Sequence, residues 1–419
     1  MIDTHIGSAK DNMNSAVHNW YKFTAGFSYK FVDLIVDDMQ TKPSCIYDPF
    51  AGCGTTLVAA QKKMINSIGI ESQKLMCDII NAKLNWDIDS LKLTNYIERI
   101  ISYVKDNIKI DISELFCNKL LIGLYDLTAL KELYLIRNAI RSINDPKYAL
   151  FLNLALSQTL HKAAIHPIAV PYISRSKYQQ NSGNALEKFH HITQQMLADL
   201  ESMPHRTRYA AVYNADSRKK NDTIANGSCD LCITSPPYLN NLDYGEVSKV
   251  HSHFFEITKD WHDITEKIRH NLVTSATTHY KDTDFNMQEF CKSEFAELNS
   301  AIIVELQDKF NSIRKNSMER GGKKSFHILM MHYFEDMFHV LKEMYRVLSY
   351  NSKAYLILGD SAPYGIYVPT TKILGEISQS VGFGDFAIYK IRERGNKWKC
   401  LKNRHNISLS ENILVLDKK

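Results

Sequence analysis

A hydrophobic run in the second half of the chain ends at two consecutive prolines. Residues 229–234 are strand-like, and Ser235, Pro236, Pro237 and Tyr238 follow them directly. Proline has no N–H and a fixed φ angle, so this pair predicts a stiff turn whose carbonyl groups remain strong acceptors. With the Ser235 hydroxyl, these acceptors suit the amino group of a planar ring that stacks on Tyr238. The four residues are the candidate catalytic set, and the alternative is a plain strand-terminating turn.

Such a cluster of acceptors can activate the amine of a nucleobase. The lone pair of that amine is delocalised into the ring, which makes the nitrogen a poor nucleophile. Acceptors that hold both amino hydrogens favour a tetrahedral nitrogen and free the lone pair for an electrophile placed in line. Most of the rate would then come from positioning and oriented dipoles rather than from a strong base.

A glycine loop earlier in the chain predicts where the electrophile binds. The segment "CIYDPFAGCGTTLVAA" (45–60) reads as a strand, a glycine turn and a helix. Gly52 and Gly54 allow the backbone to approach a ligand closely. The helix N-terminus, which Thr55 or Thr56 could cap, favours a carboxylate or phosphate. Glu71 closes the next strand, where an acid can hold ribose hydroxyls. The alternative is a tight strand–helix turn beside an exposed acid.

Three further residues complete the candidate ligand site around this loop. Asp48 and Phe50 lie at the end of the strand before the loop. Asp216 ends a third strand in "YAAVYNADSRK", where it either accepts a hydrogen bond from an adenine amino group or only forms a turn. The loop is not a phosphate-binding Walker A motif, because no G-K-[ST] follows it.

Strand-like runs alternate with helical patterns along much of the chain. The apolar strand-like runs are 44–48, 67–71, 209–214, 229–234, 354–359, 384–391 and 413–416. Helical patterns lie between most of them, for example at 55–64, 331–348 and 370–381. This alternation predicts an α/β fold with a doubly wound, mostly parallel sheet, whose ligand sites lie at the carboxyl ends of the strands.

Two long intervals break the alternation, and we interpret them as insertions. The predicted divisions are the first part of the catalytic domain with the cofactor loop (1–74), a helical insertion (75–205), the part with the catalytic loop (206–244), a smaller variable insertion (245–329) and the C-terminal part of the catalytic domain (330–419). The variable insertion is the candidate target-recognition region, and its final stretch "RKNSMERGGKKS" (314–325) is predicted to be a loop.

The composition, 44% hydrophobic and 23% charged residues, is that of a soluble globular protein. No stretch approaches the roughly 18 uninterrupted apolar residues of a membrane helix, and the N-terminus does not resemble a signal peptide, so a cytoplasmic location is expected. The eight scattered cysteines favour reduced thiols. Cys229 and Cys232 have one half of a zinc spacing without a second pair, so no metal is expected.

A basic stretch near the C-terminus is the candidate DNA contact. The segment "KIRERGNKWKCLKNRHN" (390–406) follows a predicted strand, and a net charge of +5 permits a polyanionic partner. A target base inside a duplex would have to be flipped out to reach Tyr238. The competing interpretation is a solvated charged face. The candidate DNA-binding residues are Arg392, Arg394, Lys397, Trp398, Lys399 and Arg404.

The two motifs together resemble a known family of enzymes. "DPFAGCGTT" with Glu71, followed by "TSPPY", resembles the amino-methyltransferases of DNA, which use S-adenosylmethionine to modify N4 of cytosine or N6 of adenine. The resemblance covers roughly 15–74, 206–244 and 330–419. It implies a Rossmann-like seven-stranded sheet, S-adenosylmethionine as cofactor and double-stranded DNA as partner. A cognate restriction endonuclease is a further candidate partner.

The resemblance also implies a role for each matching residue. Glu71 would hold the ribose of the cofactor, Asp216 would meet the adenine, and Phe31, in the leading helical region 18–36, would also touch the cofactor. The residues implied around the methionine part are Asp48, Phe50, Gly52 and Gly54.

Ser235 bears on the choice of base. In this family a serine before the prolines is typical of cytosine-N4 enzymes, whereas aspartate or asparagine is typical of adenine-N6 enzymes. The resemblance therefore implies a site-specific methyltransferase acting on N4 of a flipped-out cytosine, in a restriction-modification or related system. Adenine-N6 methylation, RNA guanine-N2 methylation and a nucleic-acid-binding regulator with a decayed cofactor pocket stay open as alternatives. Cytosine-C5 chemistry is disfavoured, because it needs a cysteine that normally follows a proline, and the chain has no Pro-Cys pair.

Overall fold

A single seven-stranded sheet runs through the molecule in the order β3-β2-β1-β4-β5-β7-β6. The computed structural model describes residues 6–23, 25–109, 118–168, 173, 175–204, 208–240, 242–276, 285–319, 325–394 and 407–419. Strands β1 to β5 pair in parallel, whereas β7 pairs antiparallel with both β5 and β6. The predicted α/β fold with a mostly parallel sheet is confirmed. The strands are β1 (Cys45–Asp48), β2 (Asn66–Glu71), β3 (Ala210–Asn214), β4 (Cys229–Thr234), β5 (Leu348–Gly359), β6 (Phe386–Arg394) and β7 (Leu409–Lys418).

One face of the sheet packs against two helices from the first part of the chain. Ile46, Ile233 and Ile357 share a buried cluster with residues of α1 (Tyr29–Asp38) and α2 (Thr55–Lys62). These isoleucines come from neighbouring strands and point the same way, since side chains alternate between the two faces along a strand.

The opposite face packs against helices from the C-terminal part of the chain. A second cluster contains Tyr47, Cys232 and Leu356 together with residues of α15 (Phe326–Val347) and α16 (Thr370–Val381). Each of these three strand residues is adjacent in sequence to one of the isoleucines on the first face and therefore points to the opposite side. Because both faces are covered, the central strands β1 and β4 are buried at nearly every position.

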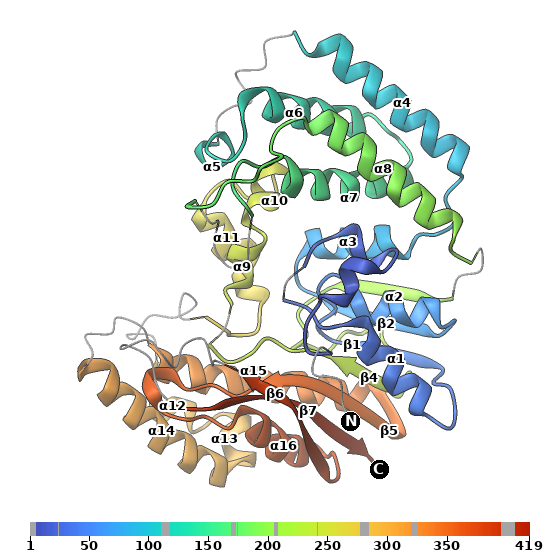
Figure 1. The fold of residues 1–419 in the computed structure, drawn as a ribbon. Coiled ribbons are helices and arrows are strands. Elements are labelled where there is room, and N and C mark those ends of the chain that lie inside the picture. The colour runs from blue at the N-terminus through green and yellow to red at the C-terminus, as the bar shows by residue number, and fades with distance from the viewer. Residues whose placement is uncertain are drawn as a thin grey trace.

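Within the interval 75–205, the described residues that follow α3 fold as a layer of helices (Figure 1). Asp89, Asp126 and Asp145 start three of these helices, because their side chains accept hydrogen bonds from backbone N–H groups of the first turns. The helices of this part are α3 (Lys74–Leu84), α4 (Ser90–Asn107), α5 (Lys119–Ile122), α6 (Leu127–Arg141), α7 (Pro146–Ala163) and α8 (Ala185–Glu201).

The interval 245–329 divides between two regions of the molecule. Its first helices lie toward the helical layer, whereas its later helices lie against the C-terminal half of the sheet (Figure 1). Phe254, for example, stacks on Tyr134 of α6 with ring centroids 5.5 Å apart. The elements are α9 (Tyr244–Val247), α10 (Lys249–Phe254), α11 (Trp261–Lys267), η4 (Arg269–Asn271), α12 (Met287–Phe290), α13 (Glu294–Leu298) and α14 (Ser300–Glu319).

The predicted loop at 314–325 is wrong over its first half. Residues 314–319 continue α14, and 320–324 lie outside the described residues. Phe310, Ile313 and Ser317 are buried on one side of that helix, a helical spacing that the surrounding charges obscure in the sequence. In the described parts of the chain, the other short 3-10 turns are η1 (Asp11–Asn14), η2 (His18–Trp20) and η7 (Pro363–Gly365).

Cys229 and Cys232 are both buried residues of β4, and the Cys229 thiol donates to the Cys45 sulfur at 3.2 Å. Within the described ranges, no group of three or more His, Cys, Asp or Glu side chains is placed to bind a metal ion. None of the helices in those ranges combines the length and the apolar character needed to cross a bilayer.

Candidate active site

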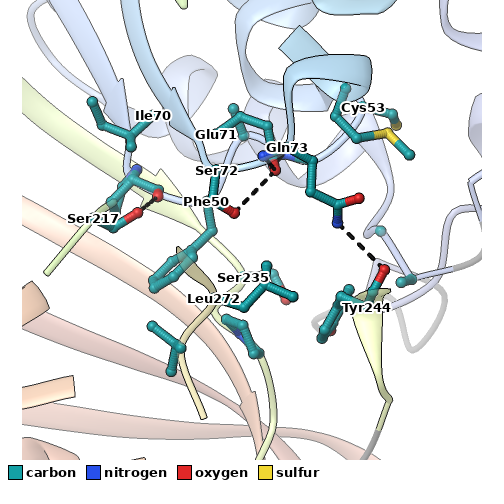
Figure 2. A pocket seen from close by; sticks show the side chains of 18 of the residues that line it. Phe50, Cys53, Ile70, Glu71, Ser72, Gln73, Ser217, Ser235, Tyr244 and Leu272 are labelled. Atoms are coloured by element: carbon teal, nitrogen blue, oxygen red, sulfur yellow. Dashed lines mark hydrogen bonds between the residues drawn. The ribbon is translucent and has the colours of Figure 1, made fainter. Parts of the chain in front are cut away.

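A cavity of about 770 Å³, its open mouth included, lies at the carboxyl ends of β1, β2 and β4 (Figure 2). This is the edge where parallel sheets hold their ligands, because the loops after neighbouring strands converge there. Among the residues that line the cavity are Phe23, Phe27, Phe50, Gly52, Thr55, Ile70, Glu71, Gln73, Ser217, Ser235, Pro237, Tyr244, Leu272 and Val273.

Glu71 is fixed in the cavity wall by backbone donors. Its Oε2 accepts from Gly52 N at 3.0 Å, and its Oε1 accepts from Gln73 N at 2.8 Å. Burial raises the pKa of Glu71 to about 7, although these hydrogen bonds act in the opposite direction. Oε1 also accepts from the Ser72 hydroxyl at 3.5 Å, whereas Oε2 keeps a second lone pair that can accept a hydrogen bond from a hydroxyl of a ligand.

The glycine loop has the backbone geometry that only glycine adopts without strain. Gly52 and Gly54 have φ angles of +55° and +85°. A Cβ on Gly54 would also lie 3.1 Å from Ile80 Cγ1. Gly54 itself is the N-cap of α2, so Thr55 does not cap the helix as expected but lines the cavity as its first residue. The loop therefore brings bare backbone against the cavity beside Glu71.

Replacing Gly54 by alanine is expected to lower the free energy of unfolding by about 1–3 kcal/mol, from left-handed strain and the contact with Ile80. Urea unfolding of the two proteins measures the difference. Gly123→Ala is the matched control, because Gly123 has a φ of −79° and no atom closer than 3.4 Å to an added Cβ. Equal losses in the two variants would contradict the argument.

Asp48 lies beneath the cavity rather than in its wall. It accepts from Thr234 Oγ1 at 2.6 Å and from Phe50 N at 3.0 Å, and burial raises its pKa to about 6. These bonds join the end of β1 to the end of β4, immediately before Ser235. Asp48 thus ties the glycine loop to the proline turn, and Phe50 is the residue of this pair that lines the cavity.

The proline turn is held by hydrogen bonds to neighbouring elements. The Ser235 hydroxyl donates to the backbone oxygen of Ile357 at 3.2 Å, and the Pro237 carbonyl accepts from the Tyr333 hydroxyl at 2.9 Å. Ser235 and Pro237 line the same cavity as Glu71, while Pro236 is buried behind them. A hydroxyl that donates to a carbonyl keeps both of its own lone pairs as acceptors.

Tyr238, the last residue of the predicted catalytic set, does not line this cavity. Its hydroxyl donates to Glu411 Oε1 at 3.0 Å, and the Arg394 guanidinium lies 4.7 Å from its ring centroid. Arg392 pairs with the same Glu411 at 2.6 Å. Gly359 leaves the room for this stacking, since a Cβ there would overlap the Arg394 side chain.

The structure thus brings Arg392 and Arg394 of the basic stretch beside the proline turn. The other candidate DNA-binding residues, Lys397, Trp398, Lys399 and Arg404, lie outside the described residues.

Four expected cofactor residues do not line the cavity: Phe31, Asp48, Gly54 and Asp216. Phe31 is fully buried between α1 and the sheet, and Phe23 and Phe27 from the same leading region line the cavity instead. Asp216 is bound by the Arg218 side chain at 2.9 Å, and its neighbour Ser217 is the lining residue.

Several lining residues were not predicted from the sequence. Gln73 lies two residues after Glu71, and Tyr244 lies six residues after Tyr238, so closeness to a motif was a usable signal for both. Leu272 and Val273 come from the variable insertion. Nothing in their local sequence distinguishes them from other apolar residues there.

Comparison with known proteins identifies similar sequences over nearly the whole chain. A family model for N6- and N4-type enzymes, described as DNA methylase, matches residues 5–82. The chain is similar to the type II methyltransferase M.BsoBI of Geobacillus stearothermophilus, with 22% identity over 461 residues, which cover 98% of this chain and 87% of the relative. It is also similar to the type II methyltransferase M.AvaI of Nostoc sp. and of Anabaena variabilis, each with 22% identity over 404 residues, 91% of this chain and 82% of the relative. A coverage of 98% takes in both intervals that the motif resemblance left unmatched.

Proposed function

We propose, from the premise that the family match and the relatives support a DNA amino-methyltransferase, that this chain methylates N4 of a cytosine flipped out of double-stranded DNA. The methyl donor is S-adenosylmethionine, and the setting is site-specific modification paired with a restriction endonuclease. One observation carries the proposal: Glu71 with the glycine loop and Ser235 with Pro237 line one cavity. A donor site and an acceptor site for a methyl group must adjoin in this way.

The cavity residues fit the methyl donor. Glu71 can accept hydrogen bonds from the ribose hydroxyls, Gly52 allows close approach of the methionine part, and Phe50 offers an apolar face. S-adenosylmethionine, when bound, supplies an electrophilic methyl group on a sulfonium sulfur.

The proline turn supplies the acceptors for the target amine. The Ser235 oxygen, oriented by its donation to Ile357 O, accepts one amino hydrogen, and carbonyl oxygens of the prolines accept the other. This holds the nitrogen so that its lone pair points toward the donor side of the cavity. The nitrogen becomes acidic once it has been alkylated, so its proton leaves without a strong base.

The identity of the base rests on Ser235. A serine at this position supports cytosine N4, and adenine N6 is the second candidate, because the matched family model includes both kinds of enzyme.

The decisive experiment is transfer of labelled methyl groups to unmethylated DNA, with the DNA then digested to nucleosides. N4-methylcytosine is the expected product. N6-methyladenine alone would overturn the choice of base, and absence of transfer to DNA would overturn the function. Transfer RNA in a parallel reaction tests the RNA guanine-N2 alternative, and a calorimetric titration with S-adenosylmethionine tests the regulator with a decayed pocket.

Replacing Ser235 by alanine is expected to lower kcat by about tenfold, because one hydrogen-bond acceptor for the amine is lost. Affinity for S-adenosylmethionine should stay within about twofold of the original, since Ser235 is proposed to contact the target amine and not the methyl donor. Single-turnover methylation and calorimetry measure the two quantities. Ser380→Ala, which removes a hydroxyl bonded within α16, is the control. An unchanged kcat for Ser235→Ala would remove this residue from the mechanism.

A further inference from the structure

A short segment of the variable insertion closes one side of the cavity. The residues that line it are Asn271, Leu272 and Val273, although α9, α10 and α11 separate them from the proline turn in the sequence. Leu272 and Val273 are buried. Figure 2 shows Leu272 and Phe50 on one side of the cavity and Gln73 and Tyr244 on the other. The segment therefore acts as a wall and not as a distant surface loop.

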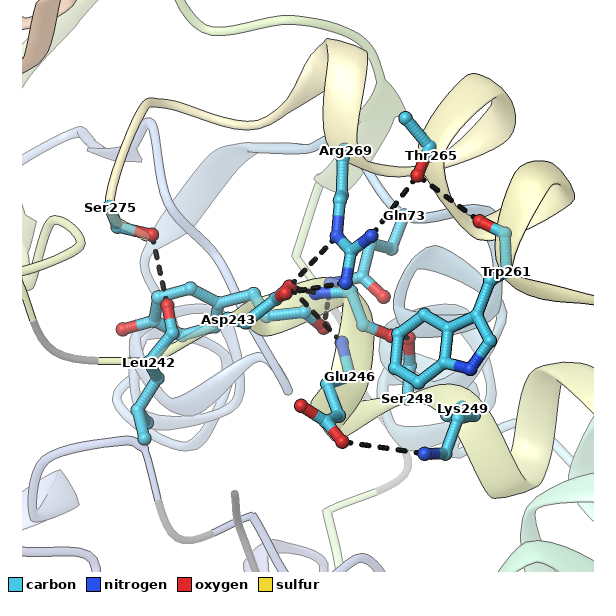
Figure 3. Close-up of polar contacts among 12 residues, drawn as sticks. Gln73, Leu242, Asp243, Glu246, Ser248, Lys249, Trp261, Thr265, Arg269 and Ser275 are labelled. Carbon is cyan, nitrogen blue, oxygen red and sulfur yellow. Dashed lines mark hydrogen bonds and ion pairs between the residues drawn. The ribbon is translucent and has the colours of Figure 1, made fainter. Parts of the chain in front are cut away.

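Arg269 fastens the N-terminal end of this wall. Its Nη2 pairs with Asp243 Oδ2 at 2.6 Å, with side chains only 8% and 10% exposed, and its Nη1 donates to Thr265 Oγ1 at 3.0 Å (Figure 3). Trp261 covers the guanidinium, 5.1 Å from its ring centroid. Asp243 also accepts from Gly245 N at 3.0 Å and so caps α9, whose first residue lines the cavity. One ion pair thus fixes two parts of the cavity wall.

Arg218 fastens the wall from the sheet side. Its Nη2 donates to the backbone oxygen of His270 at 2.8 Å. Asp216 at 2.9 Å and Asp336 at 3.0 Å hold the guanidinium in place. Asp336 also accepts from the backbone N–H of Thr274 at 2.8 Å. The backbone is therefore held just before and just after Asn271–Val273.

Ions withdrawn from water are costly unless they are paired and hydrogen-bonded. The buried Arg269 and the partly buried Arg218 both meet that condition. The result is a short peptide with both ends fixed and with apolar side chains in the cavity wall. A rigid apolar wall beside Phe50 and Ile70 suits the flat face of a purine.

We propose that Leu272 and Val273 form the wall against which the adenine ring of the methyl donor packs, and that Arg218 and Arg269 are positioning residues that hold this wall. The inference rests on the proposed function, because it takes S-adenosylmethionine as the occupant of the cavity. Asp216 then acts through Arg218 and does not contact the adenine itself.

Calorimetric titration of the full chain with S-adenosylhomocysteine tests the wall directly. Leu272→Ala and Arg269→Met are each expected to raise Kd by about tenfold, as loss of a leucine-sized apolar contact predicts. The KM for S-adenosylmethionine should rise similarly, with kcat at saturation within about twofold of the original. Arg269→Lys keeps the charge and should lie between Arg269→Met and the original chain. Arg141→Met, which breaks an exposed ion pair in the helical layer, is the control and should bind normally.

The outcomes separate the two levels of the proposal. No binding of S-adenosylhomocysteine to the original chain would overturn the proposed function. If the original chain binds S-adenosylhomocysteine and Leu272→Ala binds it equally well, only the proposed role of the wall is overturned. Circular dichroism shows whether Arg269→Met is folded, and its Kd is used only if it is. Methylthioadenosine lacks the amino-acid part of the donor. It should bind Leu272→Ala more weakly than the original chain, by the same factor as S-adenosylhomocysteine does. If it does not, the wall contacts another part of the donor and the adenine assignment is overturned.

Discussion

Replacing Tyr238 by alanine is expected to lower kcat/KM on DNA by about 5- to 150-fold, because stacking of a base on an aromatic ring is worth about 1–3 kcal/mol. The ring directly follows the proline turn, and Arg394 lies over it at 4.7 Å from the centroid. Steady-state methylation of an oligonucleotide duplex measures the loss.

Tyr238→Phe is the matched control, since it keeps the ring and removes only the hydroxyl that donates to Glu411. We expect it to lose about 0.5–1.5 kcal/mol at most, the value of one hydrogen bond. Cofactor affinity should be unchanged in both variants. An alanine variant as active as the phenylalanine variant would show that the ring does not stack on the target base.

The fold was predictable because its signals are local. The central strands β1 and β4 are short apolar runs bounded by turn residues, and their pairing follows from the parallel α/β pattern. That pattern brings the carboxyl ends of neighbouring strands to one edge. Glu71 after β2 and Ser235 after β4 therefore come to line one cavity, although the sequence separates them widely.

The parts that sequence did not predict depend on contacts between distant segments. The backbone on either side of the wall residue Leu272 is held by Arg218 and Asp336, and these three residues come from three separate places in the chain. No periodicity or motif marks such a contact.

Phe31 illustrates a signal that was present in the sequence. Phe31, Val32 and Ile35 have the spacing of one face of a helix, and all three are buried against the sheet. That spacing predicts a core position for Phe31, whereas Phe23 and Phe27 lie before the helix and are free to line the cavity.

Replacing Glu71 by alanine is expected to weaken S-adenosylhomocysteine binding by about 10- to 150-fold, the value of hydrogen bonds to a charged group. The change removes the acceptor proposed for the ribose hydroxyls. It also leaves Gly52 N and Gln73 N without their partner, which loosens the glycine loop itself. Calorimetry at about pH 8, where the carboxylate is ionised, measures the full effect.

The pH dependence of this binding separates the charge of Glu71 from its position in the loop. Because burial raises the pKa of Glu71 to about 7, protonation competes with ribose binding near neutrality, and affinity should fall as the pH is lowered through that value. Glu71→Gln keeps an acceptor but does not titrate, so its affinity should change little there. Asp48, with a pKa raised to about 6, titrates in both proteins, so the difference between the two profiles belongs to Glu71. Parallel profiles would mean that the carboxylate is not the group that meets the ligand.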